Sequence, residues 1–304
     1  ISKPYTSMTH KSEHTDYSMV SSELKTVVAI ARQAGEKIMA IYDRVSDQVD
    51  LTIQSKADHS PLTEADLAAH HCIMEGLKSL DPQTPIISEE SALPDYEERK
   101  QWTRFWMVDP LDGTKEFIKR NGEFTVNIAL IEHNVPTKGV VYAPALNLLY
   151  FAEAESGSFK QELKLDLTQN SNPNSSPNSK QDSTQDVPKD TNKSAPIQLQ
   201  SIKADPKQPL RLVESRSHGS EALENYIREH NLQISSRVAS GSSLKICLVA
   251  EGKADIYPRM APTMEWDVAA GDAVYRYSGN PSPHSSELQF NKENLLNPSF
   301  VYGF

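Results

Sequence analysis

The spacing of apolar residues predicts two helices in the first part of the chain. From Ser22 onward, one helical face carries the apolar residues Leu24, Val27, Val28, Ala31, Ile38 and Ile41. A second helix follows Pro61, and its apolar face comprises Leu67, Ile73, Met74, Leu77 and Leu80. We expect Thr63 to cap this second helix, with Asp66 three residues on at the capping-box position. Both apolar faces should pack against a core.

Short β-branched and aromatic runs separated by turn residues predict strands next. These runs cover residues 51–55, 85–88, 105–109, 124–131, 139–142 and 148–152. Strands and helices alternate later, with strands over 210–214, 233–238 and 254–257 and helices over 220–230, 244–251 and 266–277. This order predicts an α+β half joined to an α/β half.

One segment cannot contribute to a core. Between residues 168 and 196 the apolar residues are only Val187 and Ala195, so burial cannot offset the entropy of ordering. We therefore expect a low-complexity disordered insertion over residues 161–206. Residues 1–20 lack periodicity and are expected to form a flexible tail, which leaves 21–160 and 207–304 as the two halves of the fold.

Composition limits the partners of the protein. The 304 residues carry a formal charge of −10, which argues against non-specific binding to nucleic acid or to anionic membranes. The two cysteines, Cys72 and Cys247, are expected to be buried thiols in a reducing cytoplasm, although the sequence leaves a single disulfide open. No apolar run reaches transmembrane length and the first residues lack an apolar signal core, so we expect a soluble, intracellular protein.

The segment from Asp109 to Thr114, Asp-Pro-Leu-Asp-Gly-Thr, is the strongest candidate for chemistry. It places two carboxylates, Asp109 and Asp112, around a proline at the end of an apolar run. Carboxylate and carbonyl oxygens suit a hard divalent cation, and the amides beyond them suit a phosphate. The alternative is an Asp/Pro turn that closes a strand. On these six residues alone, both interpretations stay open.

Acidic residues also stand at the ends of other predicted elements: Asp58, Glu89, Glu90 and Asp267. Each one alone is more often a solvated surface group. Together they offer only oxygen ligands, without the histidine and cysteine spacing of a zinc site. That set favours Mg²⁺ over Zn²⁺.

Four ordered motifs resemble those of the inositol monophosphatase-like superfamily of Mg²⁺-dependent, lithium-sensitive phosphatases. They are Ser-Lys-Ala-Asp-x-Ser-Pro-Leu-Thr-x-Ala-Asp (55–66), Ser-Glu-Glu (88–90), Asp-Pro-Leu-Asp-Gly-Thr (109–114) and Trp-Asp-Val-Ala-Ala-Gly (266–271). The longer strings over 112–131 and 241–252 are similar to the bacterial 3'(2'),5'-bisphosphate nucleotidase branch. The resemblance implies an α+β fold, the layered α/β/α/β/α sandwich of the sugar phosphatases. It also implies a metal-binding first half and a substrate-binding second half.

The resemblance assigns roles to individual residues. It implies that two or three Mg²⁺ ions are bound by the side chains of Glu89, Asp109, Asp112 and Asp267 and the carbonyl of Leu111. Asp58 and Thr114 match the pair that orients and deprotonates the attacking water. The substrate would be contacted by these metal ligands other than Asp109, by Gly113 and Thr114, and by His218, Ser242, Lys245 and Arg259. Outside the resemblance, these last four are more simply a turn residue, a helix cap and two solvated charges.

The implied reaction is removal of the 3'-phosphate from adenosine 3',5'-bisphosphate, with the sulfated analogue as a second substrate in sulfur assimilation. One alternative is an inositol or other sugar-phosphate phosphatase. Another is a catalytically inactive nucleotide-binding module, against which the intact Asp58 and Thr114 argue. The expected location is the cytoplasm, with association at the inner membrane left open. The insertion could bind a protein partner that the sequence does not name.

Overall fold

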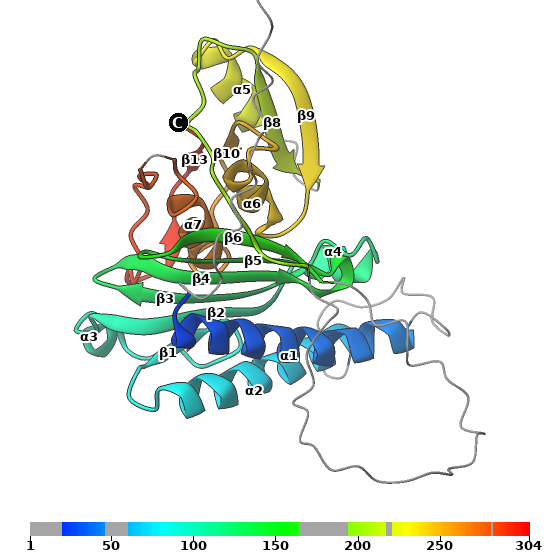
Figure 1. Cartoon of the computed structure of the whole chain (residues 1–304), viewed down its shortest axis with the longest axis vertical. Helices are drawn as coiled ribbons and strands as arrows, with labels where there is room; N and C mark the ends of the chain where they lie inside the picture. Colours follow the sequence, from blue (N-terminus) through cyan, green and yellow to red (C-terminus); the bar gives the residue numbers. More distant parts are fainter. Residues whose placement is uncertain (1–19, 46–59, 164–193, 217–220, 281) are drawn as a thin grey trace, which may run out of the picture.

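The computed structural model describes residues 20–45, 60–163, 194–216, 221–280 and 282–304. Its elements stack in five layers, which Figure 1 shows from bottom to top. The first layer holds α1 (Ser22–Val45) and α2 (Pro61–Leu80), and the second is a seven-stranded sheet. Above the sheet lie α6 (Leu244–Ala250) and α7 (Ala269–Arg276), then the parallel pair β8 (Leu210–Ser215) and β9 (Ile234–Ser240), and finally α5 (Glu221–Glu229). The expected α/β/α/β/α sandwich is confirmed.

The large sheet follows the order of the chain. Its strands are β1 (Ile86–Ser88), β2 (Arg104–Asp112), β3 (Thr125–Glu132), β4 (Val135–Ala143), β5 (Leu148–Glu153), β6 (Gly157–Glu162) and β7 (Ile197–Gln198). β1 and β2 are parallel, and every later neighbour is antiparallel. Short helices α3 (Tyr96–Arg99) and α4 (Thr114–Ile118) flank β2, and a 3₁₀ turn covers Pro144–Leu146.

Side chains of the sheet alternate between two cores because successive residues of a strand point to opposite faces. In β2, Trp106 and Val108 pack into the core formed with α1 and α2. Phe105 and Met107 pack into the core formed with α6 and α7. A third, small cluster lies beneath α5 and comprises Leu210, Leu212, Leu223, Leu232 and Ile256. The face of the sheet to which a residue belongs therefore determines whether it can reach α6 and α7.

The start of α2 differs from the prediction. Pro61 is the first helical residue and Ser60 is the cap, since the Ser60 hydroxyl accepts a hydrogen bond from the backbone N–H of Thr63 (3.2 Å). A proline at the first helical position requires no N–H donor, which favours this earlier start. Leu67 was expected on the buried face but is 38% exposed, whereas Ile73 and Leu77 are buried as expected. The strand expected over residues 51–55 lies outside the described residues.

The two ends of the predicted insertion belong to the sheet. β6 ends at Glu162, and β7 pairs with it through Phe159–Gln198 and Lys160–Ile197. The expectation of disorder over the whole of 161–206 was therefore wrong at both ends. Backbone hydrogen bonds outweighed a polar composition there. Residues 164–193 lie outside the described part of the chain, as do residues 1–19 of the predicted tail.

The C-terminal segment returns to the centre of the molecule. β13 (Phe300–Tyr302) pairs with β10 (Tyr257–Arg259), and β12 (Leu296–Asn297) pairs with β11 (Thr263–Met264). The hydroxyl of Tyr302 donates to the buried carboxylate of Asp272 on α7 (2.8 Å). The helix expected from residue 266 begins at Ala269, so Asp267 lies in the turn before it rather than in its first turn.

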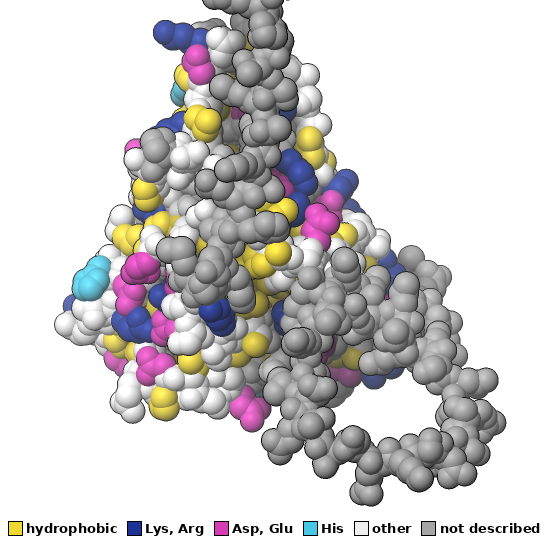
Figure 2. Space-filling view, viewed as in Figure 1, with side chains coloured by type: hydrophobic (Ala, Val, Ile, Leu, Met, Phe, Trp, Pro, Cys, Tyr) yellow, Lys and Arg dark blue, Asp and Glu magenta, His cyan; other side chains and the backbone are white. Residues whose placement is uncertain are grey.

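Figure 2 shows acidic and basic side chains interspersed over the left-hand part of this face. Arg104 pairs with both Glu23 and Glu132 (2.5 Å each). Cys72 and Cys247 are both free thiols, as expected, but only Cys247 is fully buried and Cys72 is half-buried. Among the described residues, none of the helices combines the length and the apolar character needed to cross a membrane.

Candidate active site

A β-bulge places the two aspartates of the Asp109–Thr114 segment on one face of the sheet. Asp109 pairs with Asn127 and Asp112 with Thr125, so β2 advances three residues where β3 advances two. Without the extra residue, residues three apart would point to opposite faces. Pro110 fits the bulge because it has no N–H to leave unpaired, and the N–H of Leu111 donates to Asp109 Oδ1 (3.1 Å). Both carboxylates therefore face the side of the sheet that carries α6 and α7.

Three carboxylates from separate elements meet beside this bulge. Oxygen atoms of Glu89, Asp109 and Asp267 all lie within 4.8 Å of one another. Glu89 follows β1, and its N–H donates to the carbonyl oxygen of Val108 in β2 (3.1 Å). Asp267 is oriented by the N–H of Met264, which donates to its Oδ2 atom (2.9 Å). The parallel pairing of β1 with β2 thus brings the Glu89 motif to the aspartate motif.

The electrostatics of this cluster indicate a cation. Burial raises the pKa of Asp109 well above its usual value, and the neighbouring charges of Asp112 and Glu89 raise it further. Burial and the charge of Asp112 raise the pKa of Asp267 to about 7. Several buried carboxylates can all be ionised at neutral pH only if a positive charge compensates them. An all-oxygen donor set of this kind fits a hard divalent cation.

Polar side chains from β3 and the turn before α6 hold Asp112 in place. The amide of Asn127 donates to Ser243 Oγ (2.9 Å) and lies 3.4 Å from Asp112 Oδ2. The hydroxyl of Ser243 in turn donates to the carbonyl oxygen of Asp267 (2.7 Å). Burial raises the pKa of Asp112, while the charge of Lys245 and the bond from Asn127 lower it. Asp112 therefore lies between the three carboxylates of Glu89, Asp109 and Asp267 and the ammonium group of Lys245.

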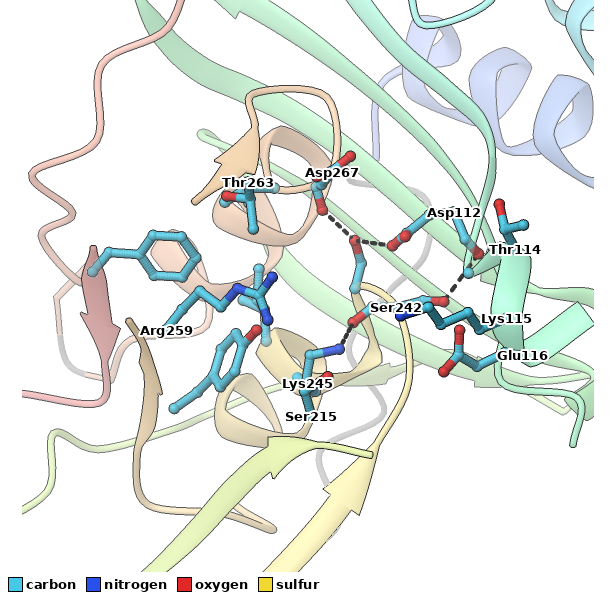
Figure 3. A pocket seen from close by; sticks show the side chains of 16 residues that line it. Asp112, Thr114, Lys115, Glu116, Ser215, Ser242, Lys245, Arg259, Thr263 and Asp267 are labelled. Atoms are coloured by element: carbon cyan, nitrogen blue, oxygen red, sulfur yellow. Dashed lines mark hydrogen bonds between the residues drawn. The ribbon is translucent and has the colours of Figure 1, made fainter. Parts of the chain in front are cut away.

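Two positively charged side chains, Lys245 and Arg259, lie across a cavity from the carboxylates of the acid cluster (Glu89, Asp109 and Asp267). Lys245 is 7% exposed, and its Nζ donates to the carbonyl oxygen of Ser242 (2.7 Å). Burial lowers the pKa of Lys245 to about 8, although Asp112 opposes the shift. Arg259 in β10 donates through Nε to the carbonyl oxygen of Ala261 (3.1 Å). Figure 3 shows Lys245 and Arg259 on one side of the space and Asp112 and Asp267 on another.

The cavity between these groups has a volume of about 250 Å³. Of the predicted residues it brings together Asp112, Gly113, Thr114, Ser242, Lys245, Arg259 and Asp267. Glu89 and Asp109 do not line the cavity themselves, but their carboxylates lie beside that of Asp267, which does. Leu111 lies in the bulge, and its side chain packs into the core formed with α1 and α2. Asp58 and His218 lie outside the described residues. The roles of all these residues remain predictions.

Several residues of the site were not predicted from the sequence. Lys115, Tyr257, Thr263 and Phe300 line the cavity, and Asn127 supports Asp112. Lys115 and Asn127 lie inside the string that carried the resemblance, so their place in that string was an available signal. Phe300 lies 33 residues beyond Asp267 in the chain, and no motif marked it. Only the pairing of β13 with β10 brings it to the cavity.

Known proteins resemble the chain over most of its length. A profile of the inositol monophosphatase family matches residues 19–281. The 3'(2'),5'-bisphosphate nucleotidase CysQ of Escherichia coli (strain K12) is 42% identical over 285 residues, which cover 91% of this chain and 98% of its own. The protein of that name from Haemophilus influenzae (strain ATCC 51907 / DSM 11121 / KW20 / Rd) is 32% identical, over 91% of each chain.

Solved structures of the same family also resemble this chain. The crystal structure of CysQ from Bacteroides thetaiotaomicron, a bacterial member of the inositol monophosphatase family, matches with a TM-score of 0.71. It is 41% identical and covers 92% of this chain and 96% of its own. Inositol monophosphatase II from Staphylococcus aureus MSSA476 shares the fold at 17% identity, with a TM-score of 0.64 over 92% of this chain and 88% of its own.

Proposed function

The chain belongs to the inositol monophosphatase family, and from that premise we propose that it hydrolyses the 3'-phosphate of adenosine 3',5'-bisphosphate to give AMP and inorganic phosphate. One observation carries the proposal: a single cavity has a carboxylate cluster on one side and Lys245 and Arg259 on the other. A substrate with two phosphates needs both. The relatives at 42% identity bear the name of this activity.

The two phosphates would meet different partners. The scissile phosphate would lie at the carboxylate side, where bound cations offset its charge. The second phosphate would lie against Lys245 and Arg259, because charge-assisted hydrogen bonds from lysine and arginine are the strong contacts to phosphate. Ser242 and His218 complete our proposed contacts to the substrate, together with Glu89, Leu111, Asp112, Gly113, Thr114 and Asp267.

Enzymes of this family depend on metal ions, and the donor set described above fits that dependence. We propose two or three Mg²⁺ ions, held by Glu89, Asp109, Asp112, Asp267 and the carbonyl oxygen of Leu111. Bound there, the ions would stabilise the negative charge on the reacting phosphate and acidify the attacking water. Thr114 and Asp58 are our candidates to orient that water and to accept its proton.

The sulfated analogue of the substrate is the second compound we expect the enzyme to hydrolyse. A role in sulfur assimilation and nucleotide recycling, in the cytoplasm, is part of the same proposal. It rests on the resemblance of the chain to the bacterial bisphosphate nucleotidases rather than on the geometry of the site.

The direct test is phosphate release from adenosine 3',5'-bisphosphate with Mg²⁺, in the presence and absence of Li⁺. We expect turnover that requires Mg²⁺ and that Li⁺ inhibits, with the Asp109→Asn variant inactive. Wild-type release no greater than that of Asp109→Asn would refute the proposal. A higher kcat/KM for inositol 1-phosphate than for the nucleotide would instead assign the protein to sugar phosphates.

A further inference from the structure

The carboxylate of Glu123, just before β3, joins three segments that are distant in sequence. Its Oε2 atom accepts hydrogen bonds from the backbone N–H of Gly241 (2.8 Å) and from Nε of Arg216 (2.6 Å). Its Oε1 atom accepts a second bond from the Arg216 guanidinium (2.6 Å). The Glu123 side chain is 17% exposed, so these bonds are partly shielded from water.

The turn that Glu123 holds is strained and tightly enclosed. Ser242 has a φ of 49°, in the left-handed region that a side chain disfavours. Its hydroxyl lies within hydrogen-bonding distance of the carbonyl oxygens of Asp112 (2.9 Å) and Glu123 (2.7 Å), which share its single proton. A Cβ atom on Gly241 would lie 2.5 Å from the Glu116 side chain and 2.9 Å from the Glu123 carbonyl oxygen. Such a conformation persists only where its surroundings enforce it.

The same turn determines where the cavity's buried cation lies. The carbonyl oxygen of Ser242 accepts the hydrogen bond from Lys245 Nζ (2.7 Å), and Figure 3 shows this contact beside the one to Asp112. A chain of contacts thus runs from Glu123 through the backbone of residues 241–242 to Lys245. Glu123 itself does not line the cavity.

We propose that Glu123 is a positioning residue for substrate binding: its carboxylate holds the Gly241–Ser242 turn against the Asp112 segment and so holds Ser242 and Lys245 where they meet the substrate. The inference rests on the proposed function for what is bound. The contacts of the carboxylate are independent of it. Because Glu123 acts on the groups that face the second phosphate, its loss should weaken substrate binding more than it slows the chemical step.

The test compares Glu123→Ala and Glu123→Gln with Glu132→Ala. Glu132 lies at the other end of β3 and also pairs with an arginine, Arg104, so its replacement removes a similar ion pair far from the cavity. For Glu123→Ala we expect KM for adenosine 3',5'-bisphosphate to rise about tenfold with kcat within about threefold of wild type. Glu123→Gln retains an acceptor for the Gly241 N–H and should recover part of the loss. Glu132→Ala should keep both constants.

Hydrogen exchange gives a second readout that does not depend on turnover. Exchange of the Gly241 amide should speed up in Glu123→Ala and be largely restored in Glu123→Gln. Unchanged exchange at Gly241, or kinetic effects equal to those of Glu132→Ala, would overturn the positioning role. A wild-type protein that does not hydrolyse the bisphosphate would count against the proposed function instead, and Gly241 exchange would still decide whether Glu123 holds the turn.

Discussion

At the scale of the residue, Lys245 is a nearly buried positive charge in the wall of the cavity, and removing that charge should weaken substrate binding. Replacing Lys245 by Met keeps much of the side chain's volume and removes its charge. We expect KM for adenosine 3',5'-bisphosphate to rise about 10- to 100-fold, since a charge-assisted hydrogen bond to phosphate is lost. Steady-state kinetics with adenosine 3'-monophosphate, which lacks the second phosphate, should show a much smaller change.

Lys253→Met is the matched control for this change, because Lys253 is 60% exposed and lies after α6, away from the cavity. Its kcat and KM should match those of the wild type with both substrates. Equal losses on the bisphosphate and the monophosphate in Lys245→Met would show that Lys245 does not read the second phosphate.

Asp267 predicts a dependence of stability on pH in the metal-free protein. Its pKa of about 7 in the fold exceeds the unfolded value of 3.8, so between these two pH values the folded state holds a proton that the unfolded state has lost. This contribution to stability is complete below about pH 4, declines as pH rises and is lost above pH 7. Asp267→Asn removes the ionisation and keeps an acceptor for the Met264 N–H. We expect the metal-free variant to match wild type near pH 4 and to exceed it by about 4 kcal/mol near pH 8 in urea unfolding.

Saturating Mg²⁺ should reverse that order near pH 8, because the cation stabilises the ionised wild-type cluster and the variant has lost a ligand. The exposed residue Glu155, changed to Gln, serves as a control and should show neither effect. A variant that gains as much from Mg²⁺ as wild type would remove Asp267 from the set of metal ligands.

Two glycines with positive φ allow strain to be separated from contact. Gly113 (φ 97°) and Gly252 (φ 70°) would both be strained by alanine, at a cost of about 1 kcal/mol each. A Cβ atom on Gly113 would also lie 2.2 Å from Ser242 Oγ, whereas one on Gly252 would meet nothing within 4 Å. We therefore expect Gly252→Ala to lose a little stability and keep its activity, and Gly113→Ala to lose most of its kcat/KM as well.

Thermal unfolding and kinetics on the same two preparations check this pair. The contact between Gly113 and Ser242 would be shown to be unimportant if both variants lost stability alike and kept full kcat/KM.

At the scale of the element, β2 shows what a sequence pattern can and cannot predict. The apolar run was sufficient to predict the strand, whereas the aspartates alone left a cation site and a strand-closing turn both open. Alternation alone, however, would send Asp109 and Asp112 to opposite faces, and only the bulge in the pairing with β3 reverses this. A bulge depends on its partner strand, so its register could not be read from the residues of β2. Pro110 was the local sign that regular pairing is interrupted.

Two other differences at this scale have causes of their own. The cap of α2 was assigned to Thr63 rather than Ser60, because both hydroxyl residues precede the apolar pattern and only backbone geometry distinguishes them. Phe300 reaches the cavity through a three-residue strand, which is too short to carry a period. Short strand pairings between distant segments depend on tertiary contacts and cannot be predicted from local sequence. The helix α1 could be predicted, because its long amphipathic pattern lies in its own residues.

At the scale of the whole molecule, the segment between β6 and β7 can be tested by removal. The side-chain amide of Gln161 donates to the carbonyl oxygen of Ser194 (2.8 Å), so the two described ends lie close together. Replacing residues 166–192 by a short Gly-Ser linker should leave kcat and KM within about twofold and Tm within about 3 °C of wild type. Kinetics and calorimetry on the full chain and the deletion would check this.

A large loss of activity in the deletion would mean that the segment contributes to the site. Extending the deletion through Ile197 and Gln198 is the informative comparison, since it also removes β7. That longer deletion should lower Tm further than the shorter one.

The division of the sheet's side chains between two cores has a consequence for how the molecule comes apart. β2 and β3 supply alternate residues to both cores, so unfolding of either helical layer would expose strands that also support the other layer. We therefore expect the two helical layers and the large sheet to unfold in one cooperative transition. The small cluster beneath α5 shares no residue with those cores. Local opening should therefore begin there, with the amides of α5 exchanging at a lower free energy than those of β3.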